Sequence, residues 1–167
     1  RGIFGADGVF IDGQLSYGYS KYNGSRYIDV GALTRKADAD FDGEQYSTKV
    51  DFGRTINLSD NFRFTPTAGV SYTHVEVNNY AETGAGDSGL DVDEQSYDIL
   101  NLSVKGKVAR TFQYKGTDLT PEVHFGYSYE ALHEKISTTT CFQGGGDNFI
   151  STGFDPANHS YLGGMGL

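Results

Sequence analysis

Apolar and polar residues alternate along six stretches of the chain. In residues 9–19, 46–58, 62–72, 100–114, 119–131 and 159–167, one parity is apolar while the other is polar or small. A period of two is the mark of a β-strand whose two faces meet different surroundings. Val75 and Val77 break the parity of the third stretch, which predicts a β-bulge near His74. The pattern therefore predicts an all-β protein built from antiparallel strands.

The connections between these stretches alternate in length. Residues 23–42, 79–95 and 136–158 are predicted to be long loops, whereas 59–61 and 115–118 are predicted to be tight turns. In an up-and-down meander this alternation places every long loop at one end of the sheet and every short turn at the other. That layout is typical of outer-membrane β-barrels, whose short turns are periplasmic.

The two parities of the predicted sheet differ in chemistry. Tyrosines gather near the strand ends of the apolar parity, as they do in the aromatic girdles of membrane barrels. We interpret this parity as facing lipid: Leu15, Tyr17, Tyr19, Val50, Phe52, Val70, Tyr72, Leu102, Val104, Val123, Phe125, Tyr127 and Tyr129. We interpret the opposite parity as lining a wet lumen: Asp12, Gln14, Lys49, Asp51, Arg63, Lys105, Lys107, Glu122, His124 and Glu130. An ordinary sheet with a solvated polar face remains an open alternative.

Length and charge narrow the possible functions. The chain has 167 residues, the size of one domain, and its net charge of −9 would repel nucleic-acid phosphates, so no nucleic-acid partner is expected. No apolar run approaches the roughly 18 to 20 residues of a membrane-spanning helix. A membrane strand needs only about 9 to 11 residues, so a transmembrane barrel agrees with the low mean hydropathy.

Motifs for chemistry are weak. Residues 38–43 are similar to the start of an EF-hand loop, but the position that needs a glutamate is occupied by Lys49. The acidic residues Asp87, Asp91, Asp93 and Glu94 are interpreted as a solvated surface loop that could hold divalent ions between lipopolysaccharide phosphates. No nucleophile turn and no metal-ligand spacing occur in the sequence. We therefore expect no enzymatic activity, no metal and no cofactor, and interpret Cys141 as an exposed thiol in a loop.

Several segments, in order, resemble the β-domain of autotransporters, the type V secretion proteins of Gram-negative bacteria. They are residues 9–19, 39–46, 64–72, 80–85, 120–127 and 142–166. The resemblance implies a twelve-stranded outer-membrane barrel, with a helical linker in its lumen and an N-terminal passenger at the cell surface. It also implies the lipid bilayer, lipopolysaccharide, the barrel-assembly machinery and the chain's own passenger as partners. Residues 1–167 would be one translocator domain, incomplete at both ends, holding the middle and later strands.

Two other functions remain open at this stage. A small outer-membrane adhesin or pore would use the long loops as its functional surface. A soluble acidic β-domain would instead bind a partner in solution.

Overall fold

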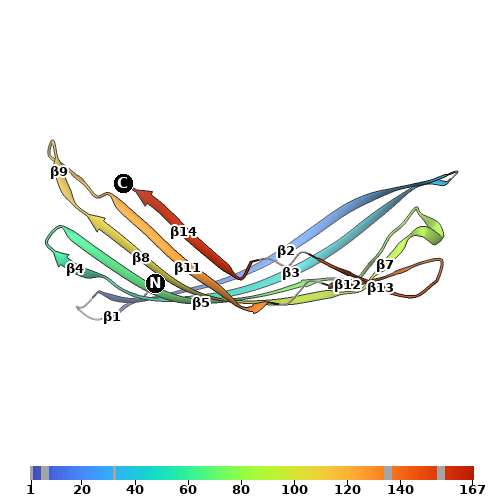
Figure 1. Ribbon diagram of the computed structural model, residues 1–167, viewed down its shortest axis with the longest axis horizontal. Helices are drawn as coiled ribbons and strands as arrows, with labels where there is room; N and C mark the ends of the chain where they lie inside the picture. Colours follow the sequence, from blue (N-terminus) through green and yellow to red (C-terminus); the bar gives the residue numbers. More distant parts are fainter. Residues whose placement is uncertain (1, 5–7, 32, 134–136, 154–156) are drawn as a thin grey trace.

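The fold is a curved antiparallel sheet. The structure, a computed structural model, describes residues 2–4, 8–31, 33–133, 137–153 and 157–167. The main sheet has the order β1-β2-β3-β5-β8-β11-β14, with β4 paired to β5, and it curls into half a barrel (Figure 1). Its strands are β1 (Gly2–Phe4), β2 (Val9–Val30), β3 (Leu33–Arg54), β4 (Ile56–Ser59), β5 (Phe62–Val77), β8 (Gln95–Arg110), β11 (Glu122–His133) and β14 (His159–Gly166). The predicted all-β antiparallel barrel architecture is confirmed.

A second, smaller sheet continues the first one. It has the order β13-β12-β7-β6, from β6 (Tyr80–Ala81), β7 (Leu90–Val92), β12 (Ser137–Phe142) and β13 (Phe149–Thr152). Asp38 of β3 and Thr83 exchange two backbone hydrogen bonds of 2.9 and 2.8 Å, which attach this sheet to β3. From β3 onward the order β6, β7, β12, β13 repeats the order β5, β8, β11, β14. Each small strand therefore extends a strand of the main sheet.

We call this extension the outer wall. It comprises residues 18–31 and 33–45 of the β2–β3 hairpin together with the small sheet, and it forms one end of the molecule (Figure 1). The hairpin turns at Gly31, whose φ of +62° suits glycine, between the paired residues Val30 and Leu33. The β6–β7 turn contains the 3₁₀ helix η1 (Gly86–Ser88).

The opposite end carries short turns, as the sequence predicts. β9 (Phe112–Tyr114) and β10 (Thr117–Leu119) form a hairpin with a two-residue turn at Lys115 and Gly116. Both residues have positive φ, 50° and 79°, the geometry that matches the twist of hairpin strands. β4 and β9 mark this end in Figure 1.

Two expectations were wrong. The predicted long loop 23–42 is almost entirely strand, and the predicted loops 79–95 and 136–158 contain the short strands β6, β7, β12 and β13. Pairing with neighbouring strands orders these segments, whose own alternation is weak. The predicted bulge near His74 does not exist, since β5 keeps one register with β8 from Phe62 to Val77. Val75 and Val77 therefore stay on the polar parity. Register shifts occur elsewhere, between Glu130 and Leu132 and between Asn57 and Ser59.

Three of the predicted strands are also interrupted. The 46–58 stretch breaks at Thr55, whose N–H donates to the Gly8 carbonyl, and the 100–114 stretch breaks at Thr111, whose N–H donates to the Asn61 carbonyl. The 119–131 stretch breaks at Thr120 and Pro121, between β10 and β11.

The main sheet has no conventional interior. No large side chain among the described residues is fully buried. Most of the apolar side chains buried among the described residues are alanines. They are Phe10, Ala37, Ala39, Ala85, Val92 and Ala109, and all but Phe10 and Ala109 lie in the outer wall or its β6–β7 turn. Within the same described ranges, no helix has the length and apolar character needed to cross a membrane.

Candidate functional site

One face of the main sheet is apolar and open. Cross-strand neighbours such as Val50 and Val70, or Val70 and Leu102, lie side by side on it. All the residues of the predicted lipid-facing set share this apolar face: Leu15, Tyr17, Tyr19, Val50, Phe52, Val70, Tyr72, Leu102, Val104, Val123, Phe125, Tyr127 and Tyr129. Leu15 and Val104 are 84% and 63% exposed. Such a broad apolar surface marks contact with lipid or with a partner.

A line of tyrosines crosses the apolar face obliquely. Tyr17 and Tyr46 form a pair at 5.1 Å. Tyr72 on β5 pairs with Thr48 of β3, which lies two residues closer to the short-turn end than Tyr46. Tyr129 on β11 pairs with Leu102 of β8, which lies two residues closer to that end than Leu100, the partner of Tyr72. We call these residues the tyrosine line. Barrel strands are tilted relative to the barrel axis, so residues at one height along that axis shift steadily in register from strand to strand, as these tyrosines do.

The other face is polar and more crowded. It contains the whole predicted lumen set: Asp12, Gln14, Lys49, Asp51, Arg63, Lys105, Lys107, Glu122, His124 and Glu130. The ammonium nitrogen of Lys107 lies 3.3 Å from Glu122, and Asp51 lies 3.0 Å from Lys49 and 3.4 Å from Lys105. These ion pairs keep the charges of both signs satisfied.

Lys105 reaches Asp51 across a whole strand. Lys105 belongs to β8 and Asp51 to β3, and β5 lies between them. Gly69 of β5 makes room, because a Cβ there would lie 1.9 Å from the Asp51 carboxylate. Side chains two strands apart converge in this way on the concave side of a curved sheet. The polar face is therefore the concave one.

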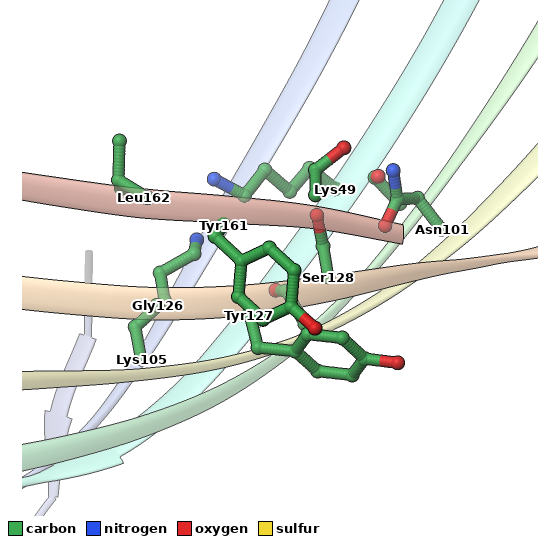
Figure 2. A pocket seen from close by; sticks show the side chains of 11 residues that line it. Lys49, Asn101, Lys105, Gly126, Tyr127, Ser128, Tyr161 and Leu162 are labelled. Carbon is green, nitrogen blue, oxygen red and sulfur yellow. The ribbon is translucent and has the colours of Figure 1, made fainter. Parts of the chain in front are cut away.

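A cavity of about 380 Å³ opens on the polar face. Two lysines and several hydroxyls line it: Lys49, Lys105, Ser71, Ser103 and Ser128. Figure 2 shows Lys49, Lys105 and Ser128 among the lining side chains. Asn101 also lines it, and its side-chain oxygen is buried without a hydrogen-bond donor within the described structure. The cavity therefore offers hydrogen bonds and positive charge to polar material.

The polarity of the two faces exchanges above the tyrosine line. The side that is apolar below it carries carboxylates above it, among them Asp42, Glu44 and Asp98. Tyr19 and Tyr72 donate hydrogen bonds of 2.6 and 2.7 Å to Asp42 and Asp98. The concave side turns apolar at the same level: Phe41, Val75, Val77, Tyr97 and Ile99. The exposed apolar band therefore has a sharp upper limit.

Contacts across β3 fasten the outer wall together. Arg26 of β2 reaches over the small residues of β3 to Glu82, with a nitrogen–oxygen distance of 2.6 Å, and Glu82 also accepts the Leu90 N–H at 3.0 Å. The hydrogen bond to Glu82 raises the pKa of Arg26. Tyr22, Phe41 and Tyr80 stack in a row with centroid separations of 5.1 and 4.3 Å. Sequence reasoning missed these partners because Arg26 and Glu82 are 56 residues apart.

The remaining candidate residues show no site for chemistry. The EF-hand-like segment 38–43 lies in strand β3, so it cannot wrap around an ion. Asp87 lies in η1 and Asp91 in β7, where Asp91 accepts a 2.9 Å hydrogen bond from Gln143. Across the described ranges, no three His, Cys, Asp or Glu side chains are placed to hold a metal ion. Cys141 lies half-buried in β12, so its assignment to an exposed loop was wrong.

The amino-acid sequence of this chain is similar to those of known outer-membrane proteins. A family model described as "Autotransporter beta-domain" matches residues 2–167. "Outer membrane protein A" of Rickettsia conorii (strain ATCC VR-613 / Malish 7) is 26% identical over 136 residues, covering 78% of this chain and 7% of that protein. "Outer membrane protein A" of Rickettsia rickettsii is 26% identical over 136 residues, covering 78% and 6%. The chain thus spans less than a tenth of the length of these relatives. It belongs to the autotransporter β-domain family, the translocator barrels of the bacterial outer membrane.

Proposed function

We propose that these strands form part of a barrel that anchors an N-terminal passenger and helps to export it to the bacterial surface. The observation that carries the proposal is the inverted burial of the main sheet. Outward-pointing Leu15 and Val104 are more exposed than the concave carboxylate of Asp51, whose side chain is 17% exposed. A protein in water would hide the apolar face. A barrel in lipid presents it.

The two faces then have separate tasks. The apolar face up to the tyrosine line contacts acyl chains, and the tyrosine hydroxyls reach the headgroup region. The concave polar face lines the lumen, where its paired charges and serines stay hydrated while polypeptide passes. The outer wall stands in the lipopolysaccharide layer outside the cell, and insertion requires the barrel-assembly machinery. Transport of this kind needs no catalytic group in the wall.

The experiment uses the native gene with its flanking sequence. We expect the product to fractionate with the outer membrane and to migrate faster on a gel when unboiled, as folded barrels do. Externally added protease should degrade the passenger on intact cells. Deleting residues 2–167 from the gene should abolish both passenger display and the fast-migrating form.

Three outcomes distinguish the candidates. Surface display that depends on residues 2–167 supports the translocator. A short gene that encodes a closed barrel and no passenger would support a small adhesin or pore, with the outer wall as its functional surface. A freely soluble product would overturn both membrane functions.

A further inference from the structure

Two arginines lie on the apolar face at the end opposite the outer wall. Arg54 is the last residue of β3 and has the parity of Val50 and Phe52. Arg110 is the last residue of β8 and is opposite Phe62 of β5. Both side chains are exposed. A guanidinium on a lipid-facing surface is costly at mid-bilayer, so its depth decides what it contacts.

The tyrosine line gives that depth. Arg54 lies eight residues beyond Tyr46 on β3. On β8 the line passes between Leu100, the partner of Tyr72, and Leu102, the partner of Tyr129, so Arg110 lies eight to ten residues beyond it. Both arginines therefore lie at a similar distance below the tyrosine line. Eight to ten residues span about 27–34 Å of strand, which a tilt of about 40° reduces to about 20–26 Å of depth.

This depth matches the lower edge of the apolar band. A barrel's outward apolar band is about 25 Å tall, and the long arginine stem can lie along apolar surface while its head extends further toward water. Phe52 and Val108 precede the two arginines on the same face and provide that surface. The guanidinium groups therefore lie at headgroup level, at the end that carries the short turns.

The charge of the two boundaries is opposite. Glu44, Glu76 and Asp98 follow the tyrosine line on this face, whereas Arg54 and Arg110 mark the lower edge. We propose that Arg54 and Arg110 bind the phosphates of anionic phospholipids in the periplasmic leaflet and so fix the barrel's depth. The guanidinium fork matches phosphate oxygens in two hydrogen bonds. The orientation rests on the proposed membrane function.

The test compares each protein with itself in two lipids. The full-length protein is folded into vesicles of phosphatidylcholine, with or without phosphatidylglycerol, and its urea unfolding is followed by gel mobility. We expect phosphatidylglycerol to raise the wild-type folding constant by roughly fivefold for each arginine, a gain that high salt removes. R54Q/R110Q should lose this gain, and R54K/R110K should keep part of it.

Arg63→Gln is the matched control. Arg63 is an arginine at the same end of the sheet, but it lies on the concave face and contacts Thr111 at 3.5 Å. It should keep the wild-type preference for phosphatidylglycerol. The proposal is overturned when R54Q/R110Q keeps the full preference, or when R63Q loses it equally. Failure of the wild type to insert into either vesicle would instead overturn the membrane function itself.

Discussion

Replacing Val104 by arginine separates a membrane barrel from a soluble sheet. Val104 lies inside the apolar band, nearer to the tyrosine line than to Arg110, and is 63% exposed. In water, a surface substitution of this kind changes stability by no more than about 0.5 kcal/mol. In a bilayer, an outward arginine costs about 2–4 kcal/mol at the midplane and about 0–1 kcal/mol near the interfaces, so we expect a cost of about 1–3 kcal/mol at this depth. Urea unfolding of the full-length protein in vesicles measures the difference, followed by the gel mobility of the folded barrel.

Ser103→Arg is the control for this prediction. Ser103 is the adjacent residue and lines the cavity on the concave face. We expect its substitution to cost less than about 1 kcal/mol, because a hydrated lumen accommodates the charge. A neutral Val104→Arg, or a Ser103→Arg that costs as much as Val104→Arg, would refute the assignment of the faces.

Three further predictions concern local geometry. Gly69→Val should destabilise the barrel by about 1–3 kcal/mol in the same assay, because its side chain would displace the aspartate beneath it; Gly13→Ala, with nothing within 4 Å of its Cβ, should be nearly neutral. Glu82→Gln should weaken the outer wall by about 1–2 kcal/mol, seen as roughly tenfold faster chymotrypsin cleavage on whole cells, while the exposed Asp87→Asn leaves the rate unchanged. Burial and the charge of Glu82 raise the pKa of Tyr80 above 10.0, so its stabilising contribution is complete below pH 10 and is lost as the pH rises through the higher value. The phenolate absorbance difference between wild type and Tyr80→Phe should titrate above pH 10, and a midpoint at 10 would contradict the reasoning.

The sequence predicts the membrane-spanning part of the fold well. Each of the two predicted sets lies together on one face of the sheet, because a strand's period of two leaves no freedom once the strand is recognised. Tight turns such as Lys115–Gly116 are predictable because glycine readily adopts the positive φ that such a turn requires.

The outer wall could not be predicted in the same way. Its strands are held by partners distant in sequence, such as Arg26 and Glu82, and by the backbone bridge from Asp38 to Thr83. The exchange of polarity between the two faces above the tyrosine line also caused the wrong prediction of a β-bulge. Val75 continues the register of β5, but its apolar side chain on the concave face resembled a bulge when only alternation was considered.

The length of the β2–β3 hairpin sets a spacing at the cell surface. β2 continues to Val30, thirteen residues past Tyr17, which is about 44 Å of strand and about 33 Å of height at a barrel tilt of about 40°. Under the proposed function, a folded passenger too wide to enter the outer wall would rest at least that far above the acyl chains, beyond the reach of a partner embedded in the bilayer.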